Sequence, residues 1–232
     1  MKSTLATSLS LLGLASARPA PADTPVRTLP PLWGFEITSL EGPGCPDKPN
    51  SSEIGTRLTF GSNTVDGSEI YYWFLAYPSL NVELGKTESV WCETELKYTE
   101  YKDIDKEEEG EDYRLRLHKN GTAVISTYEL DDDVKATFSF TYLDADVTDT
   151  YVLNGPAATS DGYGAEGYLV GPEGPPYKES KCGAATLKFR TELTVEGSGK
   201  KGVVASEIVT DDDGEERYYG TQLGFSYDWE EC

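Results

Sequence analysis

Residues 134–142 read VKATFSFTY, a run in which apolar side chains alternate with lysine, threonine and serine. The same period of two recurs in residues 185–195, ATLKFRTELTV, and in residues 92–98, CETELKY. Because successive side chains of a strand point to opposite faces, each run predicts a strand with one buried and one solvated face. This pattern is typical of antiparallel sheets, whereas buried parallel strands read as continuous apolar runs.

Further strands are expected between turn-forming clusters such as Asp66-Gly67-Ser68 and Gly197-Ser198-Gly199. They are residues 35–40, 57–61, 70–77, 113–118, 123–130, 203–210 and 218–228. We therefore expect an all-β fold, an antiparallel β-sandwich or β-barrel of about ten strands with two disulfides. The acidic run 103–112 is interpreted as a solvated loop tip. The segment 154–176, rich in glycine and proline, is interpreted as a long loop without regular structure.

The N-terminus has the pattern of a signal peptide, residues 1–17. Lys2 precedes an apolar stretch that ends in the small-x-small site Ala15-Ser16-Ala17. The stretch is too short to span a bilayer, which takes about 20 residues. We therefore expect secretion without membrane insertion, a proline-rich segment over residues 18–34, and one β-domain over residues 35–232. The net charge of −21 disfavours nucleic acid, because phosphate backbones are bound by basic surfaces.

An even number of cysteines in a secreted chain predicts disulfides. The four thiols allow three pairings, and their spacing chooses none; they are Cys45, Cys92, Cys182 and Cys232. Asn50 and Asn120 begin N-x-Ser/Thr sequons and are predicted to carry glycans. The sequence has one histidine and no two cysteines at the spacing of a zinc site, so it predicts no metal site. It also contains no phosphate-binding glycine loop, so we expect no cofactor.

The aromatic residues are the feature that points to a ligand. Residues 70–77, IYYWFLAY, show no alternation, which fits either a central strand buried on both faces or the wall of a pocket. For the second case the predicted pocket residues, chosen by strand position and type, are Tyr71, Trp73, Tyr98, Phe140, Tyr142, Phe189 and Tyr227. The residues proposed as proton donors beside such a pocket are His118 and Lys188. No Gly-x-Ser-x-Gly elbow is present for nucleophilic catalysis.

The cysteine motifs Gly44-Cys45-Pro46, Trp91-Cys92, Lys181-Cys182-Gly183 and Asp228-Trp229-Glu230-Glu231-Cys232 resemble a family of small fungal secreted proteins. That family is a four-cysteine, β-rich domain of unknown function, and the resemblance extends from Ile37 to the C-terminus. It implies sequential disulfides, Cys45–Cys92 and Cys182–Cys232, and a β-sandwich-like fold. The acidic insert at 103–112 departs from the family's Ser/Thr-rich pattern.

By a weaker analogy, the chain is similar in size, signal sequence and lack of cofactor motifs to the fungal hetero-Diels–Alderases of tropolone–sesquiterpene pathways. The analogy implies a cofactor-free cyclase that binds an apolar or aromatic small molecule and holds it in reactive geometry. Two alternatives are a non-catalytic wall-associated or host-interacting protein and a carbohydrate-binding or carbohydrate-hydrolysing protein. We expect a monomer or a weak homo-oligomer. A deep apolar pocket favours the first hypothesis, a solid core the second, and a shallow exposed aromatic platform with flanking carboxylates the third.

Overall fold

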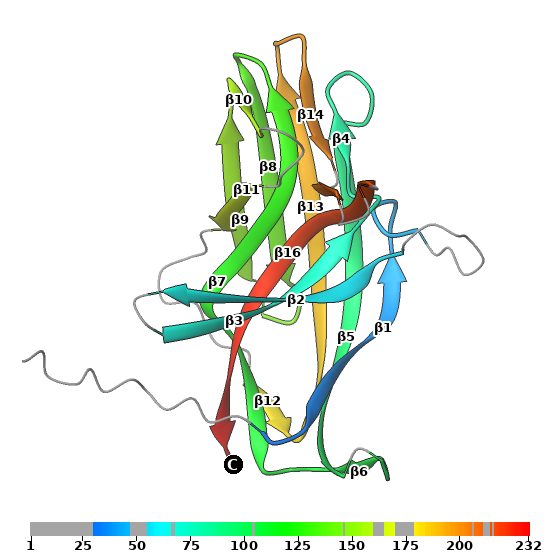
Figure 1. Ribbon diagram of the computed structural model, residues 1–232, viewed down its shortest axis with the longest axis vertical. Helices are drawn as coiled ribbons and strands as arrows, with labels where there is room; N and C mark the ends of the chain where they lie inside the picture. The colour runs from blue at the N-terminus through cyan, green and yellow to red at the C-terminus, as the bar shows by residue number, and fades with distance from the viewer. Residues whose placement is uncertain are drawn as a thin grey trace, which may run out of the picture.

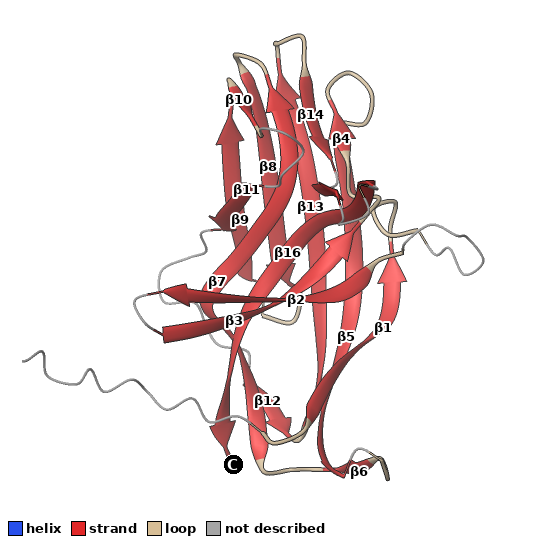
Figure 2. Ribbon diagram, in the orientation of Figure 1, coloured by secondary structure: helices blue, strands red, loops and turns tan. Residues whose placement is uncertain are grey.

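The computed structural model describes residues 30–46, 55–65, 68–103, 105–145, 147–159, 165–169, 179–205, 207–210, 214 and 216–232. Every regular element in these ranges is a β-strand (Figure 2). The strands pair antiparallel, which confirms the predicted all-β class. The predicted signal peptide and Asn50 lie outside the described residues, and so do the side chains of Tyr71, His118 and Asn120.

Two sheets contain the strands of the fold (Figure 1). The first sheet has the order β1-β5-β13-β8-β9, and a short strand β6 pairs with β5. Its members are β1 (Trp33–Glu41), β5 (Ser89–Asp103), β6 (Glu108–Glu109), β8 (Val134–Tyr142), β9 (Val147–Asn154) and β13 (Ala184–Gly197). The three alternating runs of the sequence therefore lie side by side, in β5, β13 and β8.

The second sheet has the order β2-β3-β16-β7-β14-β4, and four short strands pair with its long members β7 and β16. In Figure 1 the strands β2 and β3 run across the direction of the first sheet. The six members of the main order are β2 (Arg57–Val65), β3 (Ser68–Tyr77), β4 (Val82–Glu83), β7 (Tyr113–Leu130), β14 (Gly202–Ala205) and β16 (Glu216–Glu231). The short strands are β10 (Ala157–Ala158), β11 (Ala165–Leu169), β12 (Glu179–Cys182) and β15 (Glu207–Thr210).

The core lies between the two sheets and is built by the alternation seen in the sequence. In β8 the buried side chains are those of Val134, Ala136, Phe138, Phe140 and Tyr142. The residues between them are half-buried and lie on the outer face. Polar bonds also cross the interface between the sheets: the Trp229 indole N–H donates to the Tyr98 hydroxyl at 3.0 Å. The arrangement is a β-sandwich, one of the two architectures that the sequence predicts.

Two interpretations of individual segments are wrong. Residues 113–118 and 123–130, predicted as two separate strands, form the single strand β7. Its pairing with β16 jumps from Leu117↔Tyr227 to Thr122↔Phe225, so the extra residues bulge instead of turning the chain. The segment 154–176, predicted to have no regular structure, contains β10 and β11. Both strands pair with β7, and these backbone partners are remote in sequence, so the local composition does not reveal them.

The disulfides are Cys45–Cys92 and Cys182–Cys232, as the family resemblance implies. Cys45 and Cys92 are 2% and 0% exposed and tie the chain after β1 to β5. Cys182 is only half-buried and Cys232 is exposed, at the end of β16. The two bonds close loops of similar length but differ in their access to solvent.

This difference predicts the order in which the disulfides are reduced. With a water-soluble thiol or phosphine under native conditions, we expect Cys182–Cys232 to open first, because the reductant must reach the sulfur atoms. Alkylation at successive times followed by peptide mass spectrometry measures the order. Equal labelling of all four cysteines at every time would contradict the burial of the Cys45–Cys92 bond.

No helix that could span a membrane occurs in the described ranges.

Candidate functional site

The aromatic residues predicted to form a pocket separate into two clusters inside the sandwich. Trp73, Tyr98 and Tyr227 lie in the first cluster, where the Phe35 and Trp73 ring centroids are 4.4 Å apart and those of Tyr227 and Trp229 are 5.1 Å apart. Their exposed fractions are 5%, 0% and 4%. Burial raises the pKa of the Tyr98 hydroxyl, which stays a neutral acceptor for Trp229.

Phe140, Tyr142 and Phe189 form the second cluster, between β8 and β13. The ring centroids of Phe140 and Phe189 are 4.9 Å apart, and that of Tyr142 lies 5.1 Å from Phe140. All three side chains are buried and in edge-on or tilted contact, the geometry that aromatic rings prefer in a core. These six residues fill space between the sheets, and the structure does not bring them together around one cavity.

Lys188, one of the two proposed proton donors, points away from these rings. It follows Leu187 and precedes Phe189, both buried, so its own side chain is on the outer face of β13. There its ammonium lies 3.2 Å from the Glu95 carboxylate, and the hydrogen bond from Lys188 lowers the pKa of Glu95. Lys188 therefore cannot deliver a proton to the aromatic interior.

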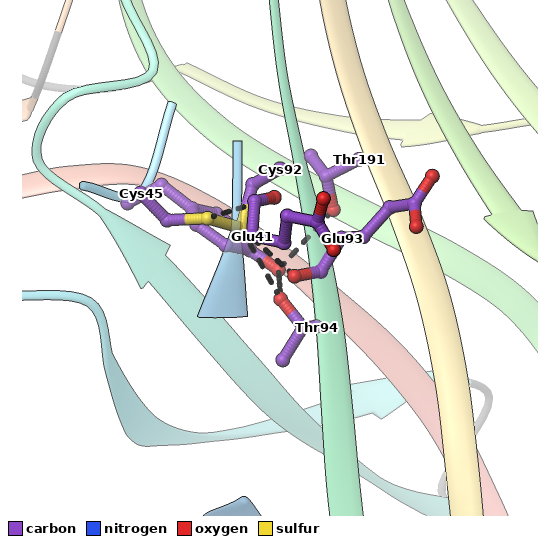
Figure 3. Close-up of a disulfide and its surroundings, with 7 residues drawn as sticks. Glu41, Cys45, Cys92, Glu93, Thr94 and Thr191 are labelled. Carbon is purple, nitrogen blue, oxygen red and sulfur yellow. Dashed lines mark hydrogen bonds between the residues drawn. A yellow bond between two sulfur atoms is a disulfide. The ribbon is translucent and has the colours of Figure 1, made fainter. Parts of the chain in front are cut away.

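A buried polar network lies next to the Cys45–Cys92 disulfide (Figure 3). The Thr94 hydroxyl is 3.4 Å from the Cys92 sulfur and 3.0 Å from the Tyr77 hydroxyl. Thr191 donates to that same hydroxyl at 3.2 Å. Burial raises the pKa of Tyr77 to about 12, so the phenol is neutral at physiological pH. The network joins β3 to β5 and β13, and we interpret it as a structural contact.

The fully buried Asp149 carboxylate forms a second internal network. It accepts a hydrogen bond from Thr122 at 2.6 Å, and the Thr122 hydroxyl is 3.4 Å from that of Tyr142. These bonds connect β9, β7 and β8 across the sandwich. Asp149 lies away from solvent, so it is not placed to act on an external substrate.

The outer face of the first sheet carries Trp91, but this indole is covered. The Arg190 guanidinium carbon lies 4.2 Å from the ring centroid, and the guanidinium also bonds the Glu93 carboxylate at 3.0 Å. On another side the ring contacts the backbone of Gly42, where a Cβ would come within 2.8 Å of two ring carbons. Gly42 has φ +127°, a conformation that favours glycine. Trp91 thus anchors the turn that leads to Cys45 and is not an open stacking platform.

The outer face of the second sheet has a cavity of about 280 Å³, formed by β7, β14 and the residue after β10. Glu129 and Lys201 form an ion pair of 2.5 Å at this cavity. Two hydroxyl side chains, two small apolar side chains and one tyrosine complete the lining: Thr127, Thr159, Val203, Ala205 and Tyr128.

Strand pairing explains why the side chains of Thr127, Glu129, Val203 and Ala205 share one face. Val204 of β14 is fully buried, so its neighbours Val203 and Ala205 point away from the core. Val203 pairs with Glu129 and Ala205 with Thr127, which places the four side chains in two adjacent rows. On the other side of β7, the Thr159 amide donates to the Tyr128 carbonyl at 2.9 Å, and the Tyr128 amide donates to the Thr159 hydroxyl at 3.1 Å. The cavity is therefore built on hydrogen-bonded strands.

No pattern in the sequence predicts this cavity. Glu129 and Lys201 are far apart in sequence, and only the pairing of β14 with β7 brings them together. The available signals were the end of an alternating strand at Glu129 and the lysine pair after the Gly197-Ser198-Gly199 turn. Within the described ranges, no group of three or more histidine, cysteine or carboxylate side chains could hold a metal ion.

The sequence matches no protein-family model and no curated protein. Among solved structures, the chain is similar to that of TmCBM61 in complex with β-1,4-galactotriose, with 9% sequence identity. The alignment covers 86% of this chain and 88% of that chain, with a TM-score of 0.17. At that score the likeness carries no argument about the fold or function of this chain.

Proposed function

We propose that this chain is a secreted, non-catalytic carbohydrate-binding protein and that the cavity between β7 and β14 takes one sugar residue. The observation that supports the proposal is the lining of the cavity, which combines the Glu129–Lys201 ion pair with the hydroxyls of Thr127 and Thr159. Its volume of about 280 Å³ lies just below the roughly 300–1,000 Å³ found for small-molecule sites. A sugar ring presents hydroxyls in every direction, so it needs many polar partners in a small space.

Binding is favoured over hydrolysis by the number of carboxylates. Glycoside hydrolysis generally uses two carboxyl groups about 5–10 Å apart. Among the described residues that line the cavity, Glu129 is the only carboxylate. A single carboxylate paired with an ammonium can hold a hydroxyl but does not supply an acid and a base.

The cyclase hypothesis gains no support from the described residues. A pericyclic step needs an apolar cavity that holds its reactants in contact. The six aromatic side chains that can be placed, of the seven predicted, pack in the interior, and Lys188 faces solvent. The disulfides fit secretion, because such bonds persist in oxidising compartments.

The substitution Ala205→Phe tests the proposal. The phenyl ring would project into the cavity, so we expect binding to insoluble polysaccharides to be lost while the fold is kept. Pull-down of the purified protein on cellulose, β-1,3-glucan, chitin and mannan measures binding, and a thermal melt checks the fold.

Val152→Phe is the matched control, because Val152 is 44% exposed on the outer face of the other sheet. It adds a similar side chain to an exposed strand position and should leave binding unchanged. If the wild-type protein binds none of the four polysaccharides, or if Ala205→Phe binds as well as Val152→Phe, the proposal is wrong.

A further inference from the structure

We infer that the Glu129–Lys201 ion pair recognises two neighbouring hydroxyls of a neutral sugar, and that the site excludes uronic acids. This inference rests on the proposed function and names the ligand class of the same cavity. The ammonium and carboxylate are 2.5 Å apart, and their side chains are 50% and 55% exposed. They form the charged part of a site that is open to a ligand.

The backbone around Lys201 is fixed before any ligand arrives. The amides of Lys200 and Lys201 both donate to one carboxylate oxygen of Asp131, at 3.0 and 2.8 Å. The Asp131 amide in turn donates to the Lys201 carbonyl at 2.9 Å. Asp131 is therefore a positioning residue, which holds the turn before β14 against the end of β7.

Glu129 is equally constrained, because its strand is paired on both sides. β14 pairs with it through Val203, and β10 pairs with it through Ala158. Since both backbones are held, the remaining freedom of the pair is in the two side chains. Because the two backbones are held already, ligand binding costs conformational entropy only in these side chains.

The pair matches the hydrogen-bonding pattern of two adjacent hydroxyls. The Lys201 ammonium can only donate, and the Glu129 carboxylate can only accept. A hydroxyl group can do both, so one hydroxyl oxygen accepts from the ammonium while its neighbour donates to the carboxylate. An exposed ion pair contributes little net free energy, so opening it to admit the two hydroxyls costs little.

Charge separates neutral sugars from acidic ones. The ion pair is neutral as a unit, and the chain carries a net charge of −21. A uronate would have to displace Glu129 from Lys201 and approach a chain of its own sign, which is unfavourable at low ionic strength. A neutral sugar leaves the Glu129 carboxylate and the Lys201 ammonium each hydrogen-bonded to a hydroxyl and is not repelled by the net charge of the chain, so its binding should change little with salt.

Isothermal titration calorimetry tests this inference with cellohexaose, laminarihexaose, mannohexaose and the hexamer of galacturonic acid. We expect at least one neutral hexamer to bind, the galacturonate hexamer not to bind, and the neutral affinity to be the same at low and high salt. Lys201→Met removes the charged donor, and Glu129→Gln keeps an acceptor oxygen but removes its charge; each should weaken binding about tenfold through the loss of a charge-assisted hydrogen bond.

The matched control is the ion pair between Lys135 and Glu196, which also has a separation of 2.5 Å and side chains exposed by 44% and 68%. It lies on the first sheet, so Lys135→Met and Glu196→Gln should leave binding unchanged. Tight binding of the galacturonate hexamer overturns the inference, and so do equal affinities of the site and control variants. If Ala205→Phe abolishes binding while Glu129→Gln and Lys201→Met do not, the proposed function stands and the inference alone fails.

Discussion

Replacing Phe189 by alanine is expected to lower the free energy of unfolding by about 3–5 kcal/mol, the usual cost of emptying a buried aromatic site. Phe189 is fully buried and in ring contact with Phe140 and Tyr142, on strands that are hydrogen-bonded to each other. Because a sheet core relaxes little, much of the vacated volume should persist as a cavity. Urea unfolding followed by tryptophan fluorescence measures the effect.

The neighbouring substitution Lys188→Ala is the control for this measurement. Lys188 lies on the same strand and contributes an exposed ion pair with Glu95, so its loss should cost less than about 1 kcal/mol. Similar losses for the two variants would contradict the assignment of inner and outer faces to β13.

Removing the Cys45–Cys92 disulfide by a double substitution to alanine is expected to cost roughly 4 kcal/mol. The bond joins residues 47 apart in sequence, and cross-linking a loop of that size restricts the unfolded chain by about this amount. The loss of buried sulfur beside Thr94 adds to the effect, since Cys92 is fully buried. Denaturant unfolding of the oxidised wild type and the variant gives the difference.

The double variant of Cys182 and Cys232 separates the two contributions. Its loop spans 50 residues, so chain entropy alone predicts nearly the same loss. Any additional loss for the Cys45–Cys92 variant therefore measures local packing. A loss below about 1 kcal/mol for that variant would show that the fold does not depend on the bond.

Strands β5, β13 and β8 of the first sheet could be predicted because burial there alternates residue by residue, whereas β9 of the same sheet was not predicted. Leu187, Phe189 and Leu193 point inward, and the charged residues between them do not. The alternation of apolar and polar residues was therefore sufficient to identify this strand. The pairing of cysteines could not be chosen from the residues and came from the family resemblance. Short strands such as β11 were missed because their partner, the edge of β7, is remote in sequence.

The site was harder to predict than the fold, for a physical reason. Alternation tells which side chains face inward, but not whether the space between them is filled or empty. Trp73 and Phe140 were expected beside a ligand, and the structure places them against other aromatic rings. The cavity instead depends on the register between β7 and β14, which places Val203 opposite Glu129 and which no local pattern of the sequence specifies.

The position of the Cys45–Cys92 bond also has a mechanical consequence. β1 is one of the two edge strands in the sheet order β1-β5-β13-β8-β9 and pairs with β5 from Trp33↔Glu100 to Glu41↔Glu93. A pulling force on the chain before β1 would peel it away pair by pair, but the peeling would stop at the covalent tether just beyond Glu41. The detached strand would stay close to β5 and could pair with it again before another molecule bound to the exposed edge of the sheet.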